Sequence, residues 1–505
     1  MASTFLSRII GLVRVKYIAW LFGSGMQADA LTAAFVLPDM IAYFLVGGAA
    51  SISFVSILTR YRETGREEEG NRSLSVILTT MYLVLGVAIA IAEVAAPLWV
   101  HWWFAGFDAP KAQLCVTLTR ILLPAQLFFF AGGVFGSVLI VRKQFSVQAV
   151  APLIYGMGTI VGGVFLYKLM GPSSLAIGTV AGAVLGPFLL NWIFARRAGA
   201  HYRVLLDWKD EGLREWVRLS LPLMLGVSVV TFDNWIIAYY ASSTNGAIAL
   251  MNYAKQMFTA PTSMLAQAAG AASMPFFASL WTQEKRYEFA VGVADSVSRV
   301  AGLGLLAASG MIALGKPLIE LIFVGGHFSE ADAGLCAVYF TIFSMTLFLW
   351  GAQSIYARAF FAAGKTLEPA IAGTIITIVS VPFYATFYHT WGVMGLAVAS
   401  NLGITLQTVT IALMLHQKHM VSLASLDYAE LGRCLLAGLV SGSVVGGAVW
   451  GLGRTHLPLP FHQGRAMDAA ILVVGSLLWM IVTKWTLEKS GSALPRVAMQ
   501  RLHLR

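Results

Sequence analysis

The sequence predicts an all-α polytopic membrane protein of about fourteen transmembrane helices, and three observations support that fold class. Of the 505 residues, 58% are hydrophobic and only 11% are charged, whereas a soluble domain carries about 25% charged residues. Apolar stretches near the roughly 20 residues that span a bilayer recur along the whole chain. These stretches are continuous, as in ILVVGSLLWMIV, and lack the period-two alternation of a transmembrane barrel.

Each predicted span is an apolar stretch bounded by polar or charged connections. The second and eighth spans are longer than most and contain Pro38 and Pro261, so a kink is expected in each. In chain order, the expected spans are 2–24, 28–58, 74–100, 115–140, 149–169, 175–195, 217–242, 248–281, 289–314, 335–363, 370–388, 393–415, 433–453 and 468–487.

The distribution of lysine and arginine over the connections predicts the orientation. Connections on one side of the membrane carry about 19 basic residues, and those on the other side carry about 4. Basic residues are retained on the cytoplasmic side, so both termini are expected to be cytoplasmic. This bias also explains the net charge of +10 without nucleic-acid binding.

A short repeat predicts two related lobes of six helices. Residues 48–58 (GAASISFVSIL) and 270–280 (GAASMPFFASL) share the pattern Gly-Ala-Ala-Ser-x-x-Phe-x-x-x-Leu. The copies lie six spans apart, an even number, so both run in the same direction, as in parallel-repeat transporters. The alternative is a coincidence among small residues that simply allow close helix packing.

This repeat suggests the domain organisation. We expect an N-lobe (1–195), a cytoplasmic linker (196–216), a C-lobe (217–415), an additional helix pair (416–487) and a cytoplasmic tail (488–505). Within the linker, 201–216 is interpreted as a short amphipathic helix on the membrane surface.

Charged residues inside the predicted spans are candidate functional groups, because a charge at the centre of a span costs about 2.5 kcal/mol or more. Arg8 and Arg14 share the first span with Gly11, and Asp29 opens the second span, where it is expected to pair with one of them. Lys255 lies six residues before a proline. Buried cations of this kind suit phosphate or pyrophosphate.

Other charges in the spans have a structural alternative, because side chains near span ends can reach the interface. Asp295 and Arg299, spaced i, i+4, are expected to satisfy each other. The remaining candidates among these charges are Lys16, Asp39, Glu93, Arg120, Asp233 and Arg358.

The sequence contains no catalytic constellation, no Walker A loop and no metal-ligand spacing, and its three cysteines lie far apart. No cofactor is therefore expected, and transport would draw on an ion gradient, the membrane potential or consumption of the product. Asp233, in TFDNW, is the candidate for a carboxylate that binds a coupling cation. The alternative is a hydrogen-bonded pair with Asn234 or with a neighbouring helix.

Six segments, in collinear order over nearly the whole chain, resemble the MurJ (MviN) lipid II flippases of the multidrug/oligosaccharidyl-lipid/polysaccharide exporter superfamily. They are FLSRIIGLVR (5–14), FGSGMQADALTAAFVLPD (22–39), LPLMLGVSV (221–229), MNYAKQMFTAP (251–261), IFVGGHFSEADA (322–333) and YARAFFAAGKTLEPAIAG (356–373).

The resemblance implies a V-shaped transporter that works by alternating access, with a cationic cavity between its lobes. It also implies that the helix pair at 416–487 forms a groove for a polyprenyl tail. Substrate-binding residues implied by the matched motifs are Arg8, Arg14, Asp29, Asp39 (in place of the usual Asn), Lys255, Gln256 (in place of the usual Arg) and Arg358.

The chain also departs from this pattern. Ala42, Tyr43 and Gly47 stand where the family usually has a basic pair and a Glu. Relatives have a longer segment before the first span, so a start upstream of Met1 stays open. These departures fit a paralogue that moves another polyprenyl-pyrophosphate glycan.

The expected function is a flippase in the bacterial inner membrane, not an enzyme, that moves the peptidoglycan precursor lipid II from the cytoplasmic to the periplasmic leaflet. Its expected partners are this substrate, the bilayer and other cell-wall synthesis proteins. The alternatives are a flippase for O-antigen or exopolysaccharide lipids and a cation-coupled multidrug exporter. A basic cavity and two extra helices argue against the exporter, and short outward connections argue against a glycosyltransferase.

Overall fold

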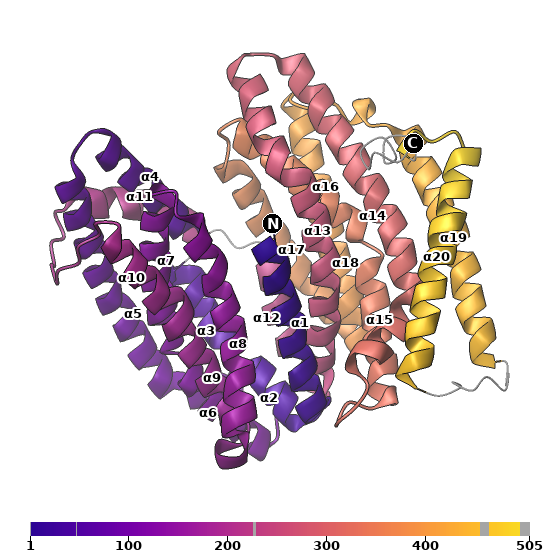
Figure 1. The fold of residues 1–505 in the computed structure, drawn as a ribbon, viewed down its shortest axis with the longest axis horizontal. Coiled ribbons are helices and arrows are strands. Elements are labelled where there is room, and N and C mark those ends of the chain that lie inside the picture. The colour runs from indigo at the N-terminus through magenta and orange to yellow at the C-terminus, as the bar shows by residue number, and fades with distance from the viewer. Residues whose placement is uncertain (1, 47, 226–228, 455–463, 495–505) are drawn as a thin grey trace. The chain divides into compact units, whose positions relative to one another are not determined.

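The computed structural model describes residues 2–46, 48–225, 229–454 and 464–494, and its regular structure there is helical apart from one bridge between Gly325 and Phe328 (Figure 1). The helices of the first half are α1 (Ala2–Phe22), α2 (Met26–Ala34), α3 (Val36–Ile41), η1 (Ala42–Val46), α4 (Gly48–Glu63), α5 (Glu67–Trp103), α6 (Ala109–Leu122), α7 (Ala125–Val141), α8 (Phe145–Met170), α9 (Ser173–Ala183), η2 (Val184–Leu190), α10 (Asn191–Arg197), α11 (Glu211–Leu225) and α12 (Val229–Ala241). Those of the second half are α13 (Ala247–Thr282), α14 (Arg286–Phe323), α15 (Glu330–Ser344), α16 (Leu347–Ala362), α17 (Leu367–Trp391), α18 (Val393–Gln417), η3 (Leu423–Ser425), α19 (Tyr428–Arg454) and α20 (Arg465–Lys489).

The predicted all-α membrane fold is confirmed. Each of the fourteen expected spans falls on one of these helices or on a run of them. Ten segments of the described chain are long and apolar enough to cross a bilayer, or eleven if α15 and α16, bent by 44°, form one span. Helices satisfy every backbone group within the span, which the hydrocarbon core requires. The count of fourteen stays a prediction.

The second span is broken as its proline predicts. Pro38 cannot donate a backbone hydrogen bond to Ala34, and the chain turns at Phe35, between α2 and α3. The carbonyl oxygen of Ala34 accepts instead from Thr119 Oγ1, 3.4 Å away on α6. In the eighth span, α13 continues as one helix through Pro261 and Pro275. The kink expected at Pro261 stays a prediction.

The chain forms two compact units, and the predicted lobe boundaries stay a prediction. Unit 1 comprises Met1–Val227 and Ala241–Ala249, and unit 2 comprises Ser228–Tyr240 and Leu250–Arg505. Helix α11, which opens the predicted seventh span, packs on α4, α5 and η1 of unit 1. Its Leu213 and Trp216 are buried in the apolar core of that unit, where Trp216 contacts Phe130.

The linker is not the surface helix predicted for 201–216, because helix begins only at Glu211. Its first half is an extended segment, 200–207, that lies along α5. Side chains one turn apart on α5 accept hydrogen bonds from backbone N–H groups of this segment. His201 N donates to Asn71 Oδ1 (3.2 Å), Arg203 N to Ser75 Oγ (3.1 Å) and Leu205 N to Thr79 Oγ1 (3.3 Å). These side-chain acceptors replace the intrahelical bonds, so an extended backbone is stable there.

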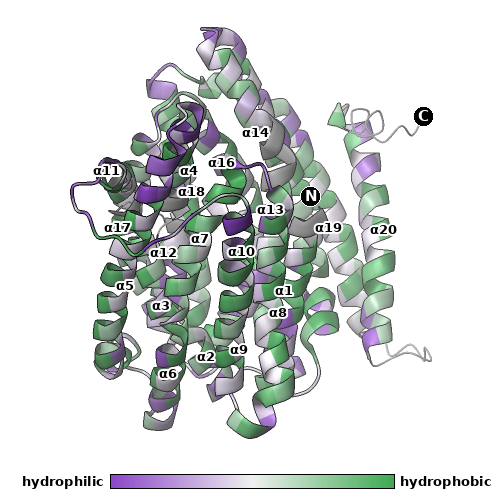
Figure 2. Cartoon of the chain, turned by 60° about the vertical axis from the view of Figure 1, so that its left-hand side comes forward, coloured by the Kyte–Doolittle hydropathy of each residue, from purple (hydrophilic) through white to green (hydrophobic). Residues whose placement is uncertain are grey.

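In unit 2, α19 and α20 pack on α14 and on each other. Trp479 Nε1 on α20 donates to Ser309 Oγ on α14 at 3.0 Å. Both helices keep large apolar side chains exposed, including Leu439 and Ile481, and Figure 2 shows α20 as mostly hydrophobic along its length. Such a surface is suited to contact with lipid chains.

Candidate substrate and ion-coupling sites

Arg14 lies in a small polar group within unit 1. Helix α1 packs closely on α8, where a Cβ on Gly156 would lie 2.9 Å from Ile10 Cγ2. This packing brings the guanidinium of Arg14 to 5.9 Å from the ring centroid of Tyr155. The carboxylate of Asp39, on α3, is within electrostatic reach of Arg14. The structure therefore joins two residues that the sequence placed on different spans, and it adds Tyr155, which the sequence did not single out.

Arg8 and Asp39 are exposed, whereas Arg14 is half-buried. Asp39 lies on α3, three residues before η1, a π-helical turn that contains Ala42 and Tyr43. Such turns are rare and occur often at functional sites. Gly47, the third departure from the family pattern, lies outside the described residues.

Asp29 does not form the predicted pair with an arginine of the first span. Its partner is Lys111 of α6, with Nζ 2.6 Å from Oδ2, and both side chains are almost fully buried (0% and 1% exposed). Asp29 also accepts from the backbone N–H groups of Gly246 (2.7 Å), which directly precedes α13, and of Ala249 (2.9 Å), in the first turn of α13. The carboxylate is thus saturated by a cation and a helix N-terminus, which both favour its charge.

The sequence analysis did not identify Lys111 as a candidate residue. The ammonium also donates to Asn245 Oδ1 (3.3 Å) and lies 4.4 Å from the ring centroid of Phe107. Phe107, four residues before Lys111, is the only local signal, since a cation beside an aromatic ring is partly desolvated. Its acid partner is 82 positions away in the chain, which local sequence does not reveal.

Asp233 and Lys255 form one buried cluster in unit 2. Lys255 Nζ on α13 donates to Asp233 Oδ2 on α12 in a short ion pair, and it donates to Asn234 Oδ1 at 2.8 Å. Asp233 also accepts a short hydrogen bond from the hydroxyl of Tyr384 on α17 and one of 2.8 Å from Ser400 Oγ on α18. The structural alternative for Asp233, pairing with a neighbouring helix, is what the geometry shows.

The two ends of this pair differ in exposure. The side chain of Asp233 is 4% exposed and that of Lys255 is 17% exposed. Asn234, the second acceptor of the ammonium, is exposed. The carboxylate is therefore the inner end of the cluster, and the ammonium is the more accessible end.

The other two predicted binding residues lie in the same unit. Gln256 follows Lys255 on α13 and is half-buried. Arg358, also half-buried, is on α16, whereas the residues that bond Asp233 come from α13, α17 and α18. Asp295 and Arg299 form the predicted i, i+4 ion pair on α14 (3.0 Å), exposed at both ends.

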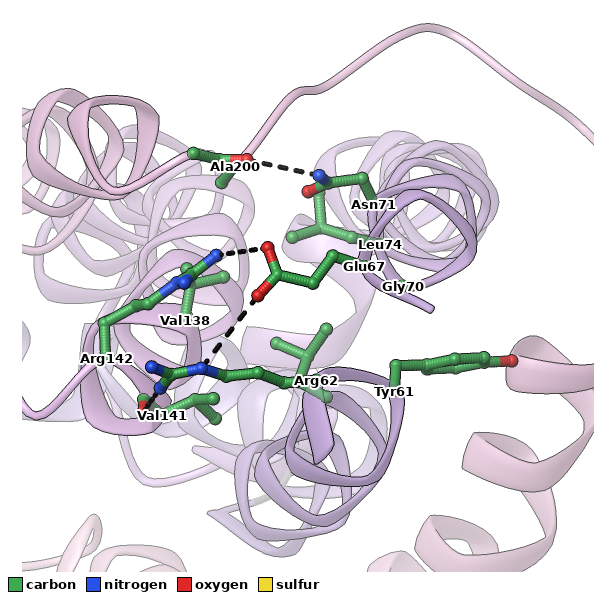
Figure 3. A pocket seen from close by; sticks show the side chains of 12 residues that line it. Tyr61, Arg62, Glu67, Gly70, Asn71, Leu74, Val138, Val141, Arg142 and Ala200 are labelled. Carbon is green, nitrogen blue, oxygen red and sulfur yellow. Dashed lines mark hydrogen bonds and ion pairs between the residues drawn. The ribbon is translucent and has the colours of Figure 1, made fainter. Parts of the chain in front are cut away.

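A further charged group lies at the connection 59–73, where a small pocket opens in unit 1 (Figure 3). Glu67 pairs with Arg142 (2.8 Å) and with Arg62 (4.0 Å), and Arg62 also donates to the carbonyl of Val141 (2.6 Å). These charges neutralise one another at an exposed surface, as expected for a solvated connection. Among the residues that the structure describes, no His, Cys, Asp and Glu side chains gather as a metal site.

Comparison with known proteins gives a consistent result. A model of the family described as "Lipid II flippase MurJ" matches residues 18–456. The probable lipid II flippase MurJ of Vibrio cholerae is 26% identical over 466 residues, covering 89% of this chain and 87% of that protein. The probable lipid II flippase MurJ of Haemophilus influenzae is 26% identical over 497 residues, covering 95% of both.

Solved structures share the fold. A lipid II flippase MurJ in an inward closed conformation matches with a TM-score of 0.79 at 20% identity, covering 97% of this chain and 98% of that one. An inward-facing multidrug resistance transporter of the MATE family matches with a TM-score of 0.68 at 18% identity, covering 81% and 94%.

Proposed function

This chain belongs to the family of the lipid II flippase MurJ, and we propose from that membership that it moves lipid II from the cytoplasmic to the periplasmic leaflet by alternating access. The observation that carries the proposal is the full-length match to proteins named as lipid II flippases in several bacteria. It would act as a multi-span protein of the bacterial inner membrane with both termini cytoplasmic, as the excess of basic residues on one side predicts.

The substrate carries a pyrophosphate between a sugar head group and a long polyprenyl chain, so its site needs cations within the membrane. Arg14 in unit 1 and Lys255 in unit 2 are suited to that role, because each is partly accessible and lies on a helix within a span predicted from the sequence. Charge-assisted hydrogen bonds to phosphate are strong where water is scarce. Arg8 and Asp39 of unit 1, and Gln256 and Arg358 of unit 2, are also proposed as substrate-binding residues.

The polyprenyl tail would contact the C-terminal helix pair. Helices α19 and α20 expose a series of large apolar side chains: Leu435, Leu436, Leu439, Val473, Val474, Leu477 and Ile481. A chain of isoprene units would pack on such a surface through van der Waals contacts, because inside the bilayer neither partner leaves water.

Asp29 takes a different part in this proposal. Its acceptor positions are occupied by Lys111 and by the first turn of α13, so we assign it to holding that turn in place. The sequence had placed it among the binding residues. Binding of phosphate by Asp29 would also require two negative groups to meet, which is unfavourable.

The test is complementation of cells depleted of their own lipid II flippase. The full-length chain is expected to restore growth and normal shape, and an Arg14→Ala variant expressed at the same level is not. A control variant, Arg299→Ala, removes an arginine of an exposed ion pair and should complement fully.

A well-expressed chain that fails to complement would contradict the lipid II assignment. The second candidate, a flippase for another polyprenyl-pyrophosphate glycan, rests on the uncharged Ala42 and Tyr43 in η1. Transport of an O-antigen type lipid in proteoliposomes, without transport of lipid II, would then identify it.

A further inference from the structure

The cluster around Asp233 contains two residues to which the sequence gave separate roles. Lys255 was assigned to the substrate phosphate and Asp233 to a coupling ion, yet the structure pairs them with each other. One ammonium does not fully neutralise a buried carboxylate and a phosphate at the same time. The two roles are therefore linked through the position of the Lys255 side chain.

We propose that Lys255 is an exchangeable counter-ion. In the structure described here it neutralises Asp233; on substrate binding it moves to a phosphate oxygen, and the Asp233 carboxylate takes up one proton from water. This inference rests on the proposed function, since it assumes an anionic substrate at Lys255. The charges balance: one ion pair breaks, one ion pair to phosphate forms, and one proton converts the carboxylate to a neutral acid.

The geometry suits such an exchange on the side of the lysine. The ammonium is the accessible end of the pair, and its second acceptor, Asn234, is exposed. A lysine carries its charge on a flexible four-carbon chain with rotatable donors. Its Nζ also lies 5.6 Å from the ring centroid of Phe343. This cation–π contact restrains the orientation of the ammonium less than a bidentate hydrogen bond would.

The geometry also suits protonation on the side of the carboxylate. Once the ammonium leaves, a charged Asp233 would be buried without a cation, which is costly. The titratable groups that the described structure places against it are Lys255 from α13 and Tyr384 from α17, while α18 supplies Ser400. The two hydroxyls donate to a carboxylate and can accept from a carboxylic acid, so both protonation states find partners.

A proton fits this cluster better than an alkaline-earth cation. Alkaline-earth ions in proteins take about six or more oxygen ligands, whereas the cluster offers one carboxylate, two hydroxyls and the Asn234 amide oxygen. The exchange also favours release of the substrate, because the Asp233 carboxylate competes with the phosphate for the Lys255 ammonium. The exchange therefore links affinity to pH.

The experiment measures proton uptake when the purified full-length protein, in detergent, binds undecaprenyl pyrophosphate in weak buffer with a pH indicator. Wild type is expected to take up about one proton for each lipid bound. By reciprocity, its dissociation constant should rise by up to about tenfold for each unit of rising pH.

The variants separate this linkage from simple loss of binding. Asp233→Asn removes the proton acceptor and the competitor, so it should bind at least as tightly as wild type, with no proton uptake above the background of the lipid. Asp295→Asn, which removes an acid of an exposed pair in the same unit, should behave as wild type. Tyr384→Phe also alters the buried cluster but keeps the Asp233 carboxylate, so it should retain proton uptake. If it does, loss of uptake in Asp233→Asn is due to loss of the carboxylate and not to a general disturbance of the cluster.

The outcomes are distinct. Wild-type binding without proton uptake, or uptake that persists in a folded Asp233→Asn variant, would overturn the exchange and leave the proposed function standing. Affinity that depends on Na⁺ in place of pH would overturn the assignment of the proton. A wild-type protein that does not bind the lipid would overturn the proposed function and this inference together.

Discussion

Lys111 and Asp29 form an ion pair whose Nζ–Oδ2 distance is 2.6 Å and from which solvent is almost fully excluded. The pair holds the turn before α13 through Asn245, Gly246 and Ala249. A buried pair of this kind is retained only while both charges are present, because each alone would be an uncompensated charge.

Replacing one member of this pair should therefore be strongly destabilising. Asp29→Asn leaves the Lys111 ammonium buried without an anion and is expected to lower the free energy of unfolding by about 3–5 kcal/mol. Asp295→Asn, at an exposed pair, should cost less than about 1 kcal/mol. Thermal unfolding of the purified variants in one detergent measures the difference, and equal shifts would contradict the role given to Asp29.

Removal of the Arg14 guanidinium should impair transport without unfolding the protein. Its half-buried position beside Tyr155 and Asp39 makes it a donor to phosphate that is worth about 1.5–3 kcal/mol. Arg14→Ala is expected to slow lipid II transport in proteoliposomes by at least about tenfold, and Arg14→Lys to restore part of the rate. Wild-type rates for Arg14→Ala would refute the assignment.

Close packing of α8 and α9 should make one glycine of unit 1 intolerant of substitution. A Cβ on Gly162 would lie 2.6 Å from Gly178 Cα, so Gly162→Ala is expected to cost about 1–3 kcal/mol through overpacking. At Gly86, on α5, a Cβ meets nothing within 4 Å, and Gly86→Ala should stabilise by about 0.5–1 kcal/mol. The check is the melting temperature of each variant; a destabilised Gly86→Ala would count against the described packing.

The extended segment 200–207 should loosen in acid. The pKa of Asp207 lies below its ordinary value because the backbone N–H of Lys209 donates to the carboxylate and Arg72 bonds to it (3.0 Å). A lowered pKa means that this attachment is intact above the ordinary value of about 3.9 and is lost as the pH falls through the folded value.

A nitroxide attached in place of Val204, which is 79% exposed, reports on this attachment. Its mobility is expected to be constant from neutral pH to about pH 4 and to rise below it. With Asp207→Asn the label should be mobile at every pH. A label whose mobility changes near neutral pH would show that another group controls the segment.

Much of the fold followed from the sequence, because hydrophobic length is a local property. A run of about 20 apolar residues has few options in a bilayer other than a helix, and every expected span lies on helical structure. The break of the second span also followed, since Pro38 lacks a backbone N–H. The extended linker did not, because its hydrogen bonds go to Asn71, Ser75 and Thr79 on another helix.

The sequence by itself identified the charged residues within apolar spans, among them Arg14, Asp29, Asp233 and Lys255. A charge there has a high free-energy cost in the bilayer, so each of these residues is expected to have a partner or a function. Only the tertiary structure decided which of them meet. Asp29 and Lys111 are 82 positions apart, and Asp233 and Tyr384 are 151 apart. Electrostatic energy depends on distance in space, and helix packing, which no single segment encodes, sets that distance.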